Sequence, residues 1–556
     1  MKTNIFAERT YYRLFFIFYI FTNTLALGYC GITTNPLGYI AIVWGFGLLI
    51  YELWKKQLFF TKNHLLLIVL YGCLLLLATL RNTAFSSTNS FVIALVQLLI
   101  FLFMFGNKKD TTLKTIKQEL RMVIPFTSLL VGLASLISLA MYVCNIYSYR
   151  NGWPLGLVGG RLFGVYFNCN PASFLAIVVI IMSMYAIKNK YKHTKLFYAN
   201  IAIQLLYVVL TKCRAAIIIL AVILVMAVYY KLFRAKEISK LKRFGLSIAL
   251  CFTALTGSYF IQEGLSIIPR LQGAYFQSGS RFQIEKIEKI VQLIHSGSVE
   301  DLKEIIRLVD QISSGRFDLT KSAVKVWERE PLNGIGAYNF RAMLLSDPST
   351  AHSGRGTQIL HSHNVFLETL VTSGMLGFLV FFCFFVKSSL MMRDVLIKYH
   401  NKESYFIILL FEMIVISECI GGFFDFGVFY NYSLSATLAW MFLGYLYWLN
   451  DHHDYELVNT SKDYEFLSYS LISISYKKQA KGEVKDLKWE IISRTLSNKE
   501  YCLTIALMMH TSIFQYRIYY TVLNDLLTKE TLQKYDPMFA KELTMMVKEE
   551  IVDLID

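Results

Sequence analysis

A series of long apolar runs constrains this chain more than any other feature. Each run approaches the ~20 residues that a helix needs to cross a membrane. Only helices and closed barrels satisfy their backbone polar groups in lipid, and runs of this length are too long for barrel strands. The runs fall at 12–29, 37–52, 64–80, 90–106, 122–147, 171–187, 196–211, 213–230, 244–262, 364–386, 404–420 and 426–449. The sequence therefore predicts an all-α polytopic membrane protein with about 12 transmembrane helices.

Composition supports a membrane protein and argues against two other classes. Charged residues make up 17% of the chain, against roughly a quarter in soluble domains. The net charge of +16 does not indicate a nucleic-acid partner, because the basic residues are spread over short loops between the apolar runs. The nine cysteines are scattered and form no Cys-x-x-Cys pair, so neither a zinc site nor a disulfide framework is indicated.

The distribution of basic residues predicts the orientation in the membrane. With the N-terminus in the cytoplasm, the inner segments hold 25 Lys and Arg residues and the short outer loops hold five. Cytoplasmic loops carry the excess of Lys and Arg. We therefore expect both ends of the membrane region in the cytoplasm.

This topology divides the chain into four parts. Residues 1–262 hold nine spans, 263–363 form a large extracytoplasmic loop, 364–450 hold three more spans, and 451–556 form a cytoplasmic tail. In the loop, apolar residues at helical spacing predict helices over 281–294 and 302–309. A third helix should begin after Gly315 and run through Trp327, ending before Pro331.

We expect the tail to be mainly helical, on segments such as Val484–Arg494 and Lys541–Leu554. It is either a cytosolic module that docks other proteins or a solubilising appendage, and the sequence favours neither.

Two histidines and an asparagine stand where the large loop enters a span, in the stretch His361-Ser-His363-Asn364. Imidazole has an unperturbed pKa of ~6.5, and a helix N-terminus disfavours its protonated form. His363 is thus suited to be a neutral base, with Asn364 as a helix cap or as a group that orients an imidazole. The alternative is that both histidines only anchor the helix end at the lipid headgroups.

Three arginines are expected on the same side of the membrane. Arg214 lies in a tight turn between two apolar runs, Arg316 opens the predicted loop helix, and Arg161 lies in a glycine-rich stretch. A planar guanidinium suits bidentate phosphate binding. The alternative is snorkelling to the headgroups, which fits Arg161 better than the other two.

Other titratable residues are weaker candidates. The two histidines with Glu368 or His352 lack a clear third metal ligand, so we expect no metal. Glu412, Glu418 and Asp425 lie in or beside the last spans. They indicate either proton coupling or polar packing between helices.

Several motifs together resemble a known family. They are Arg214-Ala-Ala216, Gly315-Arg316 with Trp327, Pro331-Leu-Asn-Gly334-Ile-Gly336 with Phe340, His361-Ser-His363-Asn364 with Leu367, Gly374 and Gly377, and Asn168 and Asn170 after Gly164. In order and spacing, over nearly all of residues 1–450, the chain resembles the O-antigen ligase and polysaccharide polymerase superfamily of bacterial envelope proteins.

The resemblance implies a metal-independent, cofactor-free glycosyltransferase in the lipid bilayer. In this family, a glycan on a polyprenyl pyrophosphate is transferred on the outer face to an acceptor hydroxyl. The family's essential histidine falls on His363, with His361 as the less secure position, and its essential arginines fall on Arg214 and Arg316. The tail after residue 450 is not part of the family pattern; the partners that the resemblance implies for it are other polysaccharide-assembly proteins.

Three functions remain open from the sequence. A polymerase accepts a second lipid-linked repeat unit and makes a capsular or exopolysaccharide, whereas a ligase accepts a lipid core, a wall polymer or a protein. We favour the polymerase, because no protein-acceptor site is evident. A transporter or flippase that uses Arg214, Glu418 and Asp425 is the alternative from a different class, although the chain shows no internal repeat.

Overall fold

The computed structural model describes residues 5–451 and 487–527, with gaps at 58–62, 151, 235–239, 272–288, 295–303, 306, 309–315, 347–360, 401–403, 426–432, 498–499, 510–511 and 522–525. The chain divides into two compact units. One comprises residues 1–111, 118–397 and 408–448, and the other comprises 112–117, 398–407 and 449–556. Each unit is described by itself.

Every expected span contains a helix. The first helices are η1 (Ile5–Ala7), α1 (Arg9–Thr24), η2 (Leu27–Cys30), α2 (Asn35–Trp54), α3 (Asn63–Arg81), α4 (Thr88–Leu99), the π-helix η3 (Ile100–Phe105) and α5 (Leu113–Val143). The next are α6 (Cys169–Lys188), α7 (Thr194–Thr211), α8 (Arg214–Arg234), α9 (Lys240–Leu271), α12 (Arg316–Trp327), α13 (Phe340–Leu345), α14 (Val365–Tyr399), α15 (Tyr405–Phe424) and α16 (Leu434–Asp451).

Among the described residues, eight helices are long and apolar enough to cross a membrane. They are α2, α3, α4 with η3, α5, α6, α7, α14 and α15. The all-α polytopic fold is thereby confirmed, while the count of about 12 spans stays a prediction. One reason for the lower number is that α1 has only 16 residues.

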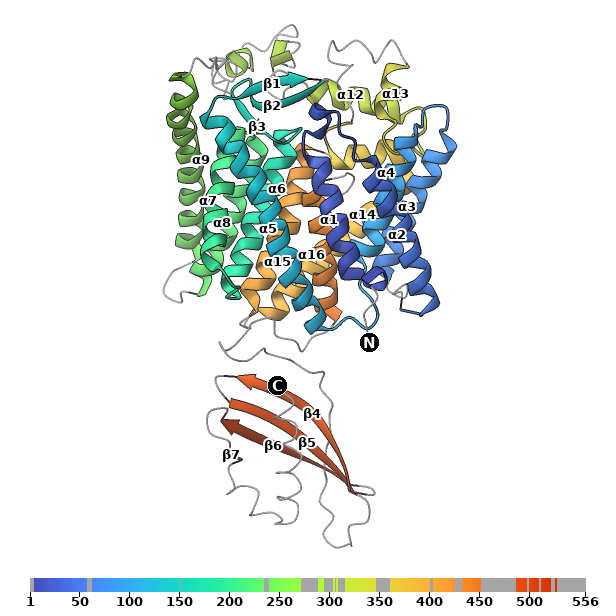
Figure 1. Cartoon of the computed structure of the whole chain (residues 1–556), viewed down its shortest axis with the longest axis vertical. Helices are drawn as coiled ribbons and strands as arrows, with labels where there is room; N and C mark the ends of the chain where they lie inside the picture. The colour runs from blue at the N-terminus through green and yellow to red at the C-terminus, as the bar shows by residue number, and fades with distance from the viewer. Residues whose placement is uncertain are drawn as a thin grey trace. The chain divides into compact units, whose positions relative to one another are not determined.

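A small sheet caps one end of the helix bundle, beside α12 and α13 (Figure 1). It consists of β1 (Tyr147–Arg150), β2 (Trp153–Val158) and β3 (Arg161–Gly164), paired antiparallel in that order. The sequence analysis treated this segment only as a short loop. The predicted helix α12 is confirmed. Residues 289–294 are helical, and much of the other predicted loop helices lies outside the described residues.

The prediction of a helical tail is wrong over Val484–Arg494. The structure has an antiparallel sheet of β4 (Leu487–Ser497), β5 (Glu500–Met509), β6 (Ser512–Thr521) and β7 (Leu526–Leu527). The alternation of apolar and charged residues in Leu487-Lys-Trp-Glu-Ile491 has the period of a strand, and pairing with β5 outweighs the local helical tendency. The segment Lys541–Leu554 lies outside the described residues.

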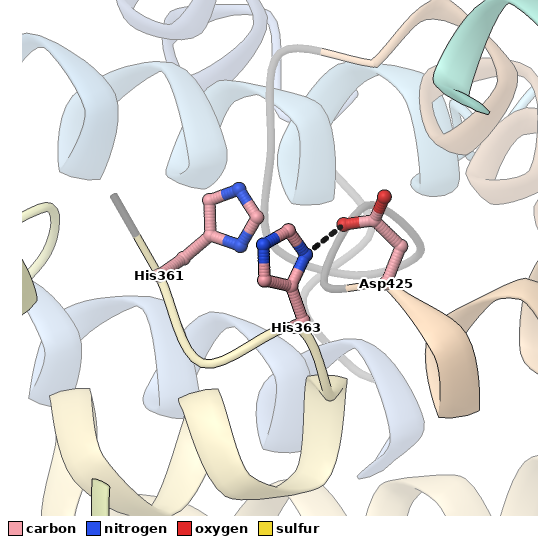
Figure 2. A group of neighbouring side chains, drawn as sticks. All are labelled: His361, His363 and Asp425. Carbon is pink, nitrogen blue, oxygen red and sulfur yellow. Dashed lines mark ion pairs between the residues drawn. The ribbon is translucent and has the colours of Figure 1, made fainter. Parts of the chain in front are cut away.

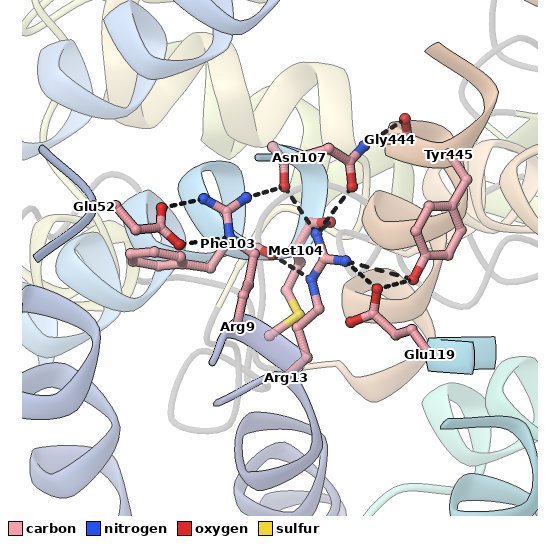
Figure 3. Close-up of polar contacts among 10 residues, drawn as sticks. Arg9, Arg13, Glu52, Phe103, Met104, Asn107, Glu119, Gly444 and Tyr445 are labelled. Carbon is pink, nitrogen blue, oxygen red and sulfur yellow. Dashed lines mark hydrogen bonds and ion pairs between the residues drawn. The ribbon is translucent and has the colours of Figure 1, made fainter. Parts of the chain in front are cut away.

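Buried ion pairs join the helices at the end of the bundle opposite the small sheet (Figure 3). Arg9 pairs with Glu52, and Arg13 donates to Glu119 at 2.7 Å. Tyr445 donates to the same Glu119 oxygen at 2.7 Å. Arg13 also donates to backbone carbonyls at and after the π-helix, including that of Phe103 at 2.6 Å. Arg9 and Arg13, two of the 25 basic residues counted in the inner segments, are therefore structural.

Helix α14 is broken at Gly374, which has φ 63° and ψ −172°. In a regular helix, the N–H groups of Met375 and Leu376 would donate to the carbonyls of Val371 and Thr372. Here they donate instead to the carbonyls of Pro331 and Leu332, at 2.8 and 3.2 Å. The two carbonyls left over accept from the N–H groups of Ile335 and Gly336, at 3.0 and 2.9 Å. Backbone hydrogen bonds therefore join the break to the segment 331–339, which we call the strap.

The other polar groups of the strap are also satisfied by neighbouring helices. Asn82 donates to the Gly334 carbonyl at 3.1 Å, and the Ala337 N–H donates to the Thr79 hydroxyl at 2.9 Å. Asn339 is fully buried, donates to the Ile335 carbonyl at 2.7 Å and accepts from Ser90 at 2.9 Å. Non-helical backbone at membrane depth requires such satisfaction within the protein.

We predict that Gly334→Ala destabilises the protein. Gly334 has φ 75°, and an added Cβ would lie 2.4 Å from the Gly374 nitrogen. A left-handed conformation costs a non-glycine residue about 1–3 kcal/mol, and the clash would separate the strap from α14. We expect a clear fall in the melting temperature in detergent. Gly264→Ala in α9 is the control: a Cβ added there meets nothing within 4 Å, so the melting temperature should stay unchanged or rise. Equal melting temperatures for the two variants would contradict this account.

Candidate active site

The two histidines lie together with an aspartate ahead of α14 (Figure 2). The rings of His361 and His363 are edge to face, with centroids 4.3 Å apart. His363 Nδ1 lies 3.5 Å from Oδ1 of Asp425, which follows α15 and is almost fully buried. A buried carboxylate beside one ring nitrogen fixes the tautomer and orientation of an imidazole.

Capping of α14 sets the direction of the histidine side chains. Asn364 is the cap, since its Oδ1 accepts from the N–H groups of Phe366 and Leu367 at 3.0 and 3.1 Å. Its Nδ2 donates to the Phe423 carbonyl at 3.4 Å, which ties the start of α14 to the end of α15. The cap role predicted for Asn364 is thus present. His363 has φ 54°, a strained conformation of the kind that clusters at functional sites.

The burial of His361 favours its neutral form. Burial lowers its pKa well below the usual value, with Asp425 acting in the opposite direction and His363 in the same one. Glu368, one helical turn into α14, is buried and accepts from the Ser362 N–H at 2.7 Å. The loop between the two imidazoles is therefore held from below by a carboxylate.

Two of the predicted arginines are close to this cluster. Arg316 opens α12, is partly buried, and lies with its guanidinium 5.9 Å from the centre of the Phe424 ring. Burial lowers the pKa of Arg316, the charge of Asp425 raises it, and the charge of Arg214 lowers it again. Arg316 is therefore near enough to interact electrostatically with both Arg214 and the carboxylate that contacts His363.

Arg161 has a different position. It donates to the Thr211 carbonyl at 2.9 Å and to Asn170 Oδ1 at 2.6 Å. The first bond holds the C-terminus of α7, immediately before the turn at Lys212 that leads into Arg214. Both bonds stay within the protein, so this geometry favours a role in positioning the turn over direct substrate contact.

A cavity of about 620 Å³ opens beside the histidines. Its wall includes His361, His363, Glu368 and Asp425. The opposite wall comes from α1, α2, α4, the segment 25–34 and Trp153 at the start of β2. Its volume falls in the range of small-molecule sites. Among the described residues that line it, neither Arg214 nor Arg316 is present.

The cluster offers a possible set of metal ligands. One nitrogen of each histidine and one oxygen of Asp425 lie within 4.8 Å of one another. Asp425 supplies the third group that the sequence analysis expected to be missing. Such a set resembles catalytic zinc sites in its ligand types, so the role of metal must be tested by experiment.

The sequence identified both histidines and both arginines, which the structure brings together. It singled out Asp425 only for proton coupling or packing, and its contact with His363 could not be read from a linear distance of 62 positions. Glu412 and Glu418 are buried in α15 and are not among the described residues that line the cavity. The sequence contains no motif that would have identified the cavity residues of α1, α2 and β2.

We predict that the cap at Asn364 stabilises the site. Asn364→Ala removes the acceptor of two N–H groups, which costs about 1 kcal/mol, and should lower the melting temperature. Asn364→Ser keeps a hydroxyl acceptor and should lie close to the unchanged protein. Equal losses in the two variants would show that the cap is unimportant.

The comparisons with known proteins agree with this geometry. Residues 199–382 match the family model described as O-antigen ligase, a region that runs from α7 into α14 and contains Arg214, Arg316, His361 and His363. No curated protein is detectably similar to the chain. The match supports the resemblance drawn from the motifs: the chain is a multi-pass membrane protein, and its residues 199–382 match the O-antigen ligase family.

Proposed function

We propose that the protein polymerises polyprenyl-pyrophosphate-linked oligosaccharide repeat units on the outer face of the bacterial cytoplasmic membrane, with both termini in the cytoplasm. One observation carries the proposal. An imidazole, His363, lies beside a buried carboxylate at the edge of a cavity, and the same carboxylate interacts with Arg316, whose charge is also felt by Arg214. This combination supplies a base for an acceptor and cations for a leaving group.

Arg214 and Arg316 serve the donor. A polyprenyl pyrophosphate leaves with its negative charge on phosphate oxygens, so the reaction needs charge stabilisation more than a proton donor. A dianion that lies between the two guanidinium groups reduces their mutual repulsion. Arg161 supports this arrangement by holding the chain ahead of Arg214.

His363 serves the acceptor. Asp425 accepts the hydrogen bond of Nδ1, which leaves Nε2 to take the proton of the acceptor hydroxyl. The acceptor oxygen attacks the anomeric carbon of the donor sugar as the bond from that carbon to the pyrophosphate oxygen breaks. The anomeric configuration is inverted, and no metal is needed in this sequence. His361, whose neutral form is favoured by burial, is the alternative base.

The acceptor distinguishes a polymerase from a ligase. We favour a lipid-linked repeat unit as acceptor, and the family described as O-antigen ligase keeps transfer to a lipid, wall polymer or protein as the second candidate. Both use the same donor and the same residues.

We predict that His363→Ala lowers kcat by about 10²–10⁴-fold, as expected for the loss of a general base. Purified protein in detergent would be given a polyprenyl-pyrophosphate-linked repeat unit from the source bacterium, with excess chelator, and products would be resolved as a ladder on a gel. Arg316→Ala should abolish the ladder and Arg316→Lys should restore it only in part, because lysine lacks the bidentate geometry.

Matched controls are available in the same chain. His193 is exposed and Arg393 is a surface residue, so His193→Ala and Arg393→Ala should keep full activity. A ladder that disappears with chelator alone would make the site metal-dependent. Transfer only after a lipid core or wall acceptor is added would make the protein a ligase. Full activity of folded His363→Ala and His361→Ala proteins would refute the assignment of the base.

A further inference from the structure

The cavity beside the histidines has a chemical character of its own. Five aromatic residues line it together with several amides and hydroxyls, namely Tyr19, Tyr39, Trp153, Phe167 and Tyr338. We propose that the cavity binds the acceptor glycan and selects an uncharged sugar at the position that receives the new bond. This inference rests on the proposed function and names the class of acceptor for the same site.

Trp153 is held in place as a stacking surface. A Cβ added at Gly28 would lie 2.3 Å from the Trp153 ring, so the indole packs directly against the backbone of η2. Its other neighbour is Phe167, with ring centroids 6.0 Å apart in an edge-on arrangement. A rigid indole that lines a cavity offers an apolar face with little conformational entropy to lose. The apolar C–H face of a pyranose ring is complementary to such a surface.

Tyr338 lines the cavity from the strap. It has φ 60° and is 41% exposed. A left-handed conformation is strained for an aromatic residue, and here it is imposed by the hydrogen bonds of Ala337 and Asn339 on either side. The strap therefore fixes the backbone that presents this ring.

The wall also contains a hydrogen-bond donor whose need is unmet in the protein. The Nδ2 atom of Asn23 is buried and has no hydrogen-bond partner, while Oδ1 of the same side chain accepts from Thr34. A buried donor without a partner is costly. Asn23 lines the cavity, so a turn of its side chain toward the cavity lets a sugar hydroxyl supply the missing acceptor. Asn89 and Thr33 line the same space and offer further groups of this kind.

The charges of the wall argue for an uncharged sugar. The described lining contains two carboxylates, those of Glu368 and Asp425, and two imidazoles, but no Lys or Arg. An acidic sugar would have to leave water for a site where the fixed charges are negative and its own charge finds no cationic partner. The cations of the site, Arg214 and Arg316, are not part of this lining. A sugar with only hydroxyl and amide groups meets no such penalty.

The first test identifies the acceptor chemically. The gene would be deleted in the source bacterium, and the glycan that is lost would be analysed by linkage analysis and NMR. We expect the acceptor sugar, whose hydroxyl receives the new glycosidic bond, to be uncharged. A uronic acid or another anionic sugar at that position would overturn the proposal. If no glycan is lost and purified protein transfers none, the proposed function itself fails, which is a distinguishable result.

The second test examines the cavity wall in the purified protein. Trp153→Ala should raise KM for the native acceptor by at least about tenfold with kcat little changed, since stacking on one aromatic residue binds without touching the reacting atoms. Trp153→Phe should restore most of the affinity. The exposed Trp54 (76% exposed) provides the control Trp54→Ala, which should have no effect.

Asn23→Leu provides an independent variant if Trp153→Ala does not fold. It removes the unsatisfied donor, so it should leave the melting temperature unchanged or raised while KM for the acceptor rises. Unchanged KM in folded Trp153→Ala and Asn23→Leu proteins would overturn the assignment of the cavity. A loss of kcat without a change in KM would also contradict it, because that pattern belongs to the reacting groups.

Discussion

The exchange of backbone hydrogen bonds at Gly374 is the interaction on which the site depends. Two bonds that would close within α14 are replaced by four bonds with the strap, two in each direction. The strap is continuous with α12, because Trp327 Nε1 donates to the Pro331 carbonyl at 3.1 Å. Leu319, Val326, Ile335, Phe340 and Val371 form one buried cluster from these elements. Arg316 at the start of α12 and His363 ahead of α14 are therefore parts of one packed body, although 47 positions separate them in the sequence.

The same constraint explains why polar residues are buried in apolar surroundings at both ends of the bundle. Irregular backbone leaves carbonyls and N–H groups that lipid cannot satisfy. Near the site, the backbone groups of the strap form hydrogen bonds with the side chains of Thr79, Asn82 and Asn339. At the other end, the carbonyls at and after the π-helix are met by Arg9 and Arg13, whose charges are balanced by Glu52 and Glu119. Breaking such a buried pair is strongly destabilising, so these arginines serve the fold rather than the reaction.

The sequence was sufficient for features that depend on local pattern. Apolar run length predicted the helices of the membrane region, and the residue types around Asn364 and Lys212 predicted a cap and a turn. It was insufficient where distant segments decide the outcome. The break in α14 is visible only once the strap lies beside Gly374, and Asp425 meets His363 only through the packing of α15 on α14. The tail strands were missed for a different reason: they pair as consecutive hairpins, and the alternation over residues 487–491, which indicates a strand, was interpreted as part of a helix.

The carboxylate of Asp425 determines how charge is distributed over the site. It contacts His363, and its charge also acts on Arg316. Without it, two guanidinium groups would face two imidazoles, and any proton taken by His363 would add to an uncompensated cluster of cations. In the proposed reaction, Asp425 stabilises the proton that His363 receives from the acceptor, while the arginines keep a net positive charge for the departing pyrophosphate. The carboxylate thus separates a cationic side from a cavity whose described wall holds no cation except a protonated histidine. A transferase that joins two glycans needs this asymmetry, because only the donor loses its pyrophosphate in the reaction.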